Sequence, residues 1–124
     1  VKECLKSLAE TVQIHVLTAD TFGKAASQFE SLPVTLSVLP KRADEDIGKL
    51  EYVKRLGCDH TACIGNGRND ALMLRESVLG FAVILEEGAS VKTLIAADVV
   101  FTNIASALES LMNPLRLTAT LRNG

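Results

Sequence analysis

The segment Cys63–Asp70 concentrates the residues best suited to chemistry. It reads CIGNGRND and follows a short apolar run. Gly65 and Gly67 allow the backbone to turn sharply and to approach a ligand closely. Asn66 and Asp70 add side-chain oxygens of the kind that Mg²⁺ prefers. In a parallel sheet such a turn lies at the carboxyl end of a strand, where α/β proteins bind ligands, so the segment predicts a Mg²⁺-binding loop.

Two further polar residues could complete a site for a phosphoryl group. Thr18 follows another apolar run, and its hydroxyl, together with the backbone N–H of Ala19, could bind a phosphoryl oxygen. Lys49 lies in a predicted helix, where its ammonium could stabilise the same group and keep a nearby carboxylate ionised. Lys41 and Lys54 are the competing candidates for this role.

Each candidate also has a purely structural interpretation. Thr18 could simply end a strand, and Lys49 could be a solvated lysine on a helix surface. Asp70 at a helix start complements the helix dipole, and Asn69 could cap that helix. His15 and His60 lack metal-ligand spacing and are expected to be structural. The charged segments 42–46 and 86–88 are expected to be solvated.

Helical and strand patterns alternate along the chain. Apolar spacing predicts helices near 2–11, 21–30, 44–56, 69–76, 90–97, 105–111 and 115–121. Short β-branched and apolar runs predict strands near 13–17, 34–39, 60–64, 80–85 and 98–101. The helix at 44–56 is expected to bury one aliphatic face, made of Ile47, Leu50, Val53 and Leu56. The alternation predicts one three-layer, Rossmann-like α/β domain with a mainly parallel sheet.

Composition excludes several classes of partner. The 124 residues are 48% hydrophobic and 4% aromatic, with a formal net charge of -2, so we expect no nucleic-acid partner. No apolar run approaches the ~18 residues of a membrane span, so we expect no membrane partner. Cys4, Cys58 and Cys63 are odd in number and lack zinc spacing, which favours the reducing cytoplasm.

Three segments, taken in order, resemble motifs of the haloacid dehalogenase (HAD) superfamily of phosphatases and phosphotransferases. The segment 16–21 (VLTADT) resembles the family's Thr motif, and Leu39-Pro40 followed by Lys49 resembles its lysine motif. The segment 65–70 (GNGRND) resembles its acidic metal motif. Within the superfamily the chain looks most like the phosphorylation domain of P-type ATPases and its small soluble relatives. The segment 96–100 (AADVV) resembles the segment that closes the sheet in those ATPases.

The resemblance implies a Mg²⁺-dependent hydrolase or phosphatase that acts on a small phosphorylated substrate. Thr18 and Lys49 would be catalytic, and with Ala19 they would bind the phosphoryl group. Asn66 and Asp70 would act on the metal. Three residues of the same loop would support the site: Gly65, Gly67 and Asn69. The interval between Thr18 and Lys49 is too short for a cap domain, which implies an open site or one roofed by a neighbouring subunit.

The chain departs from the family pattern at two places. The family's first metal-binding Asp is replaced by Asn66, and its nucleophile loop, an Asp-x-x-Gly-Thr pattern, has no match before Thr18. Asp20, with Gly23 after it, resembles that loop only faintly. In the family the nucleophile strand lies centrally, between the Thr strand and the metal strand, and an empty slot there would expose unpaired backbone groups.

The span 1–124 is therefore expected to be a HAD-like core that lacks its first strand. About 30 upstream residues, the size of one βα unit, would supply that strand and the nucleophilic Asp. A complementing N-terminal segment and a homo-oligomer are both open as partners. An alternative function is a catalytically inactive phosphate- or metal-binding or assembly module, which the missing nucleophile and Asn66 favour. An oligomerising structural subunit would instead expose an apolar helix at 115–121.

Overall fold

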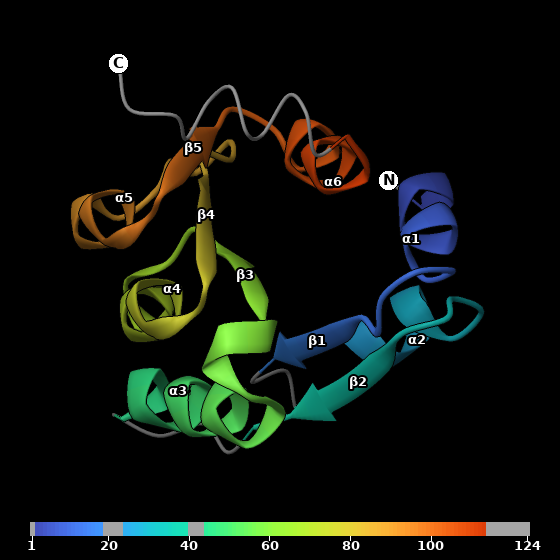
Figure 1. Ribbon diagram of the computed structural model, residues 1–124, viewed down its shortest axis with the longest axis horizontal. Helices are drawn as coiled ribbons and strands as arrows, with labels where there is room; N and C mark the ends of the chain where they lie inside the picture. Colours follow the sequence, from blue (N-terminus) through green and yellow to red (C-terminus); the bar gives the residue numbers. More distant parts are fainter. Residues whose placement is uncertain (1, 19–23, 40–43, 114–124) are drawn as a thin grey trace.

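A computed structural model describes residues 2–18, 24–39 and 44–113, except for the side chains of 24–26 (Figure 1). The helices are α1 (Lys2–Leu8), α2 (Lys24–Phe29), α3 (Glu45–Leu56), α4 (Ala71–Glu76), α5 (Val91–Ala96) and α6 (Ile104–Met112). Two single 3₁₀ turns are η1 (Cys58–His60) and η2 (Arg68–Asp70). The strands are β1 (His15–Thr18), β2 (Thr35–Val38), β3 (Ala62–Gly65), β4 (Leu79–Val83) and β5 (Val99–Phe101). Every helix and strand predicted within these residues is present, with its ends shifted by a few positions.

All strand pairs are parallel, as the alternating pattern predicts. β1 pairs with β2, and β4 lies between β3 and β5. Within the described residues the strands form two separate sheets, with no ladder between β1 and β3. Among these residues, the two sheets are held together by the helices that cover them.

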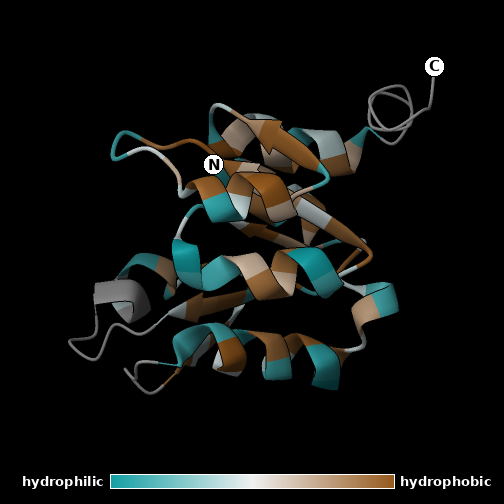
Figure 2. Ribbon diagram, turned by 90° about the vertical axis from the view of Figure 1, so that its left-hand side faces the viewer, coloured by the Kyte–Doolittle hydropathy of each residue, from teal (hydrophilic) through white to brown (hydrophobic). Residues whose placement is uncertain are grey.

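The helices cover the strands on both faces. In Figure 1, α3, α4 and α5 lie on one side of the strands, and α1, α2 and α6 lie on the other. Along β4 the side chains alternate between these layers: Ala82 packs in the α3/α4 cluster, whereas Phe81 and Val83 pack with Ala107 of α6. In Figure 2 the strands are mostly hydrophobic, whereas the helices alternate between hydrophobic and hydrophilic residues. The predicted three-layer, Rossmann-like α/β fold is confirmed.

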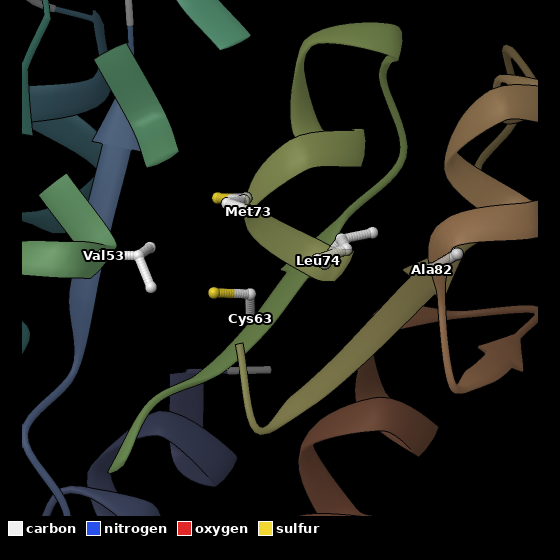
Figure 3. Packing of buried hydrophobic residues seen from close by; sticks show 5 residues of the cluster. All are labelled: Val53, Cys63, Met73, Leu74 and Ala82. Atoms are coloured by element: carbon white, nitrogen blue, oxygen red, sulfur yellow. The ribbon is translucent and has the colours of Figure 1, made fainter. Parts of the chain in front are cut away.

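Two apolar clusters join the sheets. On one face the buried cluster contains Val53, Cys63, Met73, Leu74 and Ala82, and Leu17 of β1 packs against it. Figure 3 shows the sulfur atoms of Cys63 and Met73 pointing toward Val53 of α3. On the other face α1 and α6 pack together, and both Ile14 and Ile64 lie against them. Helix packing thus bridges β1 and β3 on both faces.

The predicted aliphatic face of α3 is wrong for Ile47 and Leu56, whereas Val53 is buried and Leu50 is partly buried. Only Val53 is fully buried, at 2% exposed, whereas Ile47 and Leu56 are 46% and 38% exposed. The side chains that point inward with Val53 are those of Lys49 and Tyr52, spaced as residues of one helix face. The partners of Lys49 and Tyr52 are polar side chains, so hydrogen bonds and an ion pair act together with Val53 packing to set which side of α3 faces the sheets.

No helix among the described residues is both long and apolar enough to cross a bilayer. The predicted helix at 115–121 and the residues Ala19 and Asp20 lie outside the part of the chain that the structure describes.

Candidate functional site

The loop after β3 is organised by one buried carboxylate. Asp70 is 6% exposed and lies where η2 meets α4. Its Oδ2 accepts hydrogen bonds from the backbone N–H groups of Asn66 and Gly67, at 3.1 and 3.0 Å. A Cβ atom at Gly65 would lie 2.5 Å from the Asp70 carboxyl group, so glycine is required there by close approach. The loop is therefore closed by its own last residue.

Lys49 of α3 reaches across to this carboxylate. Its Nζ is 2.6 Å from Asp70 Oδ1 and 3.3 Å from Asn69 Oδ1. The Lys49 and Asp70 side chains are only 13% and 8% exposed, so the pair lies largely out of water. Of the competing lysines, Lys54 is exposed and Lys41 lies outside the described residues. The lysine and metal motifs thus meet, although they are far apart in sequence.

Asn69 does not cap α4, contrary to the structural interpretation of that residue. Its Nδ2 donates to Glu45 Oε2 at 2.7 Å, while its Oδ1 accepts from Lys49. Glu45 was missed by sequence reasoning, which placed it in a solvated helix entry. One signal could have found it, because Glu45 lies four residues before Lys49 and such residues share a helix face.

A second segment supports the loop from the opposite side. Asn66 Nδ2 donates to Glu87 Oε1 at 3.1 Å, and the Asn66 carbonyl accepts from the Ser90 N–H at 2.9 Å. Thr93, which is fully buried, donates its hydroxyl to the carbonyl of Gly67 at 2.5 Å. Glu87 is exposed, as predicted for the turn 86–88, but it contacts the predicted metal residue. Neither Glu87 nor Thr93 carries a local sequence signal for these contacts.

Thr18 is the last residue of β1. It lies in register with Val38 of β2, and its carbonyl accepts from the Leu39 N–H at 2.7 Å. The preceding residue, Leu17, packs against the cluster that contains Val53 and Met73. Val53 lies one helical turn after Lys49, and Met73 lies one turn after Asp70. A direct meeting of Thr18 with the Lys49–Asp70 pair stays a prediction.

The side chains of this loop offer few oxygens to a hard cation such as Mg²⁺. Both Asp70 oxygens accept hydrogen bonds, from Lys49 and from two backbone N–H groups, and Glu87 Oε1 accepts from Asn66 Nδ2. Among residues 2–18, 24–39 and 44–113 no group of three His, Cys, Asp or Glu side chains is arranged to hold a metal. Mg²⁺ does not need one, because it usually keeps several waters and binds one or two carboxylates plus substrate phosphate. The two histidines lie elsewhere: His15 is hydrogen-bonded to Tyr52, and His60 lies beside Asp59.

Comparisons with known proteins agree with this fold. The chain is similar to an uncharacterized protein of Methanocaldococcus jannaschii, MJ0073, with 40% identity over 87 residues that span 67% of this chain and 94% of that protein. It resembles 3-deoxy-D-manno-octulosonate 8-phosphate phosphatase of Moraxella catarrhalis, solved with magnesium, phosphate and KDO, at a TM-score of 0.72 and 18% identity. That match covers 98% of this chain and 75% of the phosphatase.

A further solved structure is similar in the same way. A putative HAD family hydrolase from Streptomyces avermitilis has a similar structure. The match has a TM-score of 0.63 and 17% identity and covers 82% of this chain. The present chain spans only 57% of that protein. No family model matches the sequence. The chain has the α/β fold of the HAD superfamily, and it belongs to the same family as the archaeal protein MJ0073.

Proposed function

We propose that the intact protein is a Mg²⁺-dependent phosphatase of the HAD type that acts on a small phosphorylated substrate. The observation that carries this proposal is the buried contact between Lys49 and Asp70, 2.6 Å long, at the carboxyl end of β3 in a HAD-like fold. Parallel α/β sheets bind ligands at that edge. The Moraxella catarrhalis phosphatase, solved with magnesium and phosphate, supports this class of ligand.

The proposal gives each residue a separate task. Lys49 has three N–H groups, and two are directed to Asp70 and Asn69, so the third can bind a phosphoryl oxygen. Thr18 would donate its hydroxyl to a second phosphoryl oxygen, together with the N–H of Ala19. Asp70 holds the lysine in place and keeps the loop closed. Asn66 supplies an oxygen to Mg²⁺, which when bound neutralises charge on the phosphoryl group.

The nucleophile belongs to a segment outside residues 1–124 in this proposal. β1 and β3 are not paired with each other in the described part of the chain, and open strand edges are normally covered in native proteins. A parallel strand between them would end beside the carboxyl ends of both, next to the Lys49–Asp70 pair. An Asp carboxylate at that position would attack phosphorus while the ester P–O bond breaks and the alcohol leaves, and water would then hydrolyse the aspartyl phosphate. The described chain is then one HAD-like core completed by this strand, similar to the P-type ATPase branch of the superfamily.

The test is Mg²⁺-dependent release of p-nitrophenol from an aryl phosphate by the intact protein. We expect Asp70→Ala and Lys49→Met each to abolish turnover, and chelation of Mg²⁺ to do the same. Lys54→Met is the matched control, because Lys54 is an exposed lysine of the same helix, and it should retain full activity. Turnover that persists in both Asp70→Ala and Lys49→Met would contradict the assignment.

A second candidate is a phosphate- or metal-binding module without turnover. It is favoured by the amide of Asn66 at a metal position, and by the contacts of both Asp70 oxygens to Lys49 and the loop backbone. Calorimetry with Mg²⁺ and inorganic phosphate discriminates the two, because the module would bind these ions and release no p-nitrophenol. For either function the free cysteines favour the cytoplasm.

A further inference from the structure

Tyr52 is the centre of a polar network between α3 and the β1–β2 sheet. Its hydroxyl oxygen is 2.9 Å from His15 Nδ1 and 2.8 Å from Ser37 Oγ. Its ring packs edge-on against the His15 ring, with centroids 5.7 Å apart. On the other side, the Arg55 guanidinium lies 5.4 Å from the centre of the ring. One side chain of α3 therefore contacts both strands of this sheet.

The placement of Tyr52 within α3 gives this network its importance. Lys49, one turn earlier on the same helix face, bonds to Asp70 of the β3 loop. α3 is thus tied to the β3–β4–β5 sheet by Lys49 and to the β1–β2 sheet by Tyr52. Besides the apolar clusters on both faces, α3 thus connects the two sheets through hydrogen bonds and an ion pair within the described residues.

Hydrogen bonds fit this task better than aliphatic packing does. A phenol hydroxyl has one donor and can also accept, so it can bond His15 and Ser37 together in only a narrow range of helix rotations. Apolar contacts are non-directional and would allow α3 to slide or rotate. Aliphatic residues at these positions could pack just as well, so the polar network is better explained by specificity than by stability.

We propose that Tyr52 is a positioning residue that sets the spacing between Lys49 and Thr18, an inference that rests on the phosphatase function proposed above. His15 lies three residues before Thr18 on β1, and Ser37 pairs with Leu17 on β2. Fixing Tyr52 on these strands therefore fixes Lys49 relative to the end of β1. Loss of the hydroxyl would let α3 shift by a fraction of an ångström, and small misplacements of binding groups lower turnover strongly.

The test uses Tyr52→Phe in the intact protein, because phenylalanine keeps the ring contacts and removes only the hydroxyl. We expect kcat for p-nitrophenyl phosphate to fall roughly tenfold, with KM changed less than twofold. The matched control is Thr61→Val, which removes a hydrogen bond of 2.7 Å to Gly57 at the end of the same helix. It should lower the unfolding midpoint comparably and leave kcat unchanged. Ser37→Ala, a milder change, serves if Tyr52→Phe does not fold.

The outcomes separate this inference from the proposed function. If the wild-type protein is active and Tyr52→Phe keeps the kcat of Thr61→Val, the positioning role is wrong and the phosphatase stands. If the wild-type protein binds inorganic phosphate without turnover, the phosphatase is wrong. In that case the positioning role of Tyr52, which is stated for kcat, is wrong with it. A wild-type protein that neither binds nor hydrolyses phosphate overturns both.

Discussion

The ion pair between Lys49 and Asp70 is the contact whose removal should perturb this protein most. The two side chains are 13% and 8% exposed, and their charged atoms lie 2.6 Å apart. Both charges are therefore poorly hydrated, and each depends on the other for compensation. We expect Asp70→Asn to cost more stability than Lys49→Met, because the two substitutions leave different groups behind.

The magnitudes follow from the partners that remain. Asp70→Asn leaves the Lys49 ammonium with the Asn69 oxygen at 3.3 Å. The amide of the new asparagine has only one oxygen. Its NH₂ group must therefore face either the Lys49 ammonium or the N–H groups of Asn66 and Gly67, and these are all donors. Breaking a buried ion pair from one side is strongly destabilising, so we expect a loss of about 3 kcal/mol. Lys49→Met leaves the Asp70 carboxylate with its two backbone donors and should cost about 1–2 kcal/mol.

Urea unfolding of the wild type, both single variants and the double variant measures the coupling. We expect the double variant to lose about 1.5–3 kcal/mol less than the sum of the single losses, because no charge is left unpaired. Lys54→Met should stay within about 0.5 kcal/mol of the wild type, since Lys54 is exposed. Additivity within about 0.5 kcal/mol would refute a coupled, poorly hydrated pair.

Three other changes test separate parts of the structure. Gly65→Ala should displace the Asp70 carboxyl group and lower the free energy of unfolding in urea by about 2 kcal/mol or more. Gly48→Ala is the control, because open space surrounds its Cβ, and it should raise the free energy of unfolding by about 0.5–1 kcal/mol. Equal effects of the two substitutions would contradict this view of the loop. Thr93→Val should cost about 0.5–1.5 kcal/mol, because it removes the Thr93 hydrogen bond to the Gly67 carbonyl, which still accepts from the Asp70 N–H, and a neutral result would contradict that contact. Burial raises the pKa of the Cys63 thiol from 9.0 to about 11. The stabilising contribution of the protonated thiol is then complete below pH 9 and is lost as pH rises through about 11. The difference in free energy of unfolding between the wild type and Cys63→Ala should therefore shrink by about 2 kcal/mol by pH 11. A difference that does not change with pH would contradict this.

The fold could be predicted because its signals are local. Alternating helical and β patterns identify the elements, and Gly57 ends α3 with a φ of 103°, as a glycine after a helix indicates. Parallel pairing follows from that alternation. The polar part of the α3 face, Lys49 and Tyr52, could not be predicted, because its partners are distant in sequence and polar. A pattern of aliphatic residues carries no information about an interior surface made of Asp70, His15 and Ser37.

The site was predictable in the same limited way. Motif order was enough to predict that Lys49 and Asp70 belong to one site, and the structure brings them together at 2.6 Å. It was not enough for Glu45, Glu87 or Thr93. Each of these residues contacts the loop only through the tertiary fold. Glu45 lies at a helix entry, Glu87 in an exposed turn and Thr93 at a buried helix position. Their residue types are common in solvated positions, so the sequence around them favours a solvated role.

The most direct test of the central claim is a crystal structure of the intact protein with Mg²⁺ and phosphate. We predict one phosphate ion whose oxygens lie about 3 Å from both the Lys49 ammonium and the Thr18 hydroxyl, with Mg²⁺ beside Asn66 on the same ion. A phosphate bound elsewhere, or a Lys49–Thr18 separation too wide for one phosphate to bridge, would contradict it.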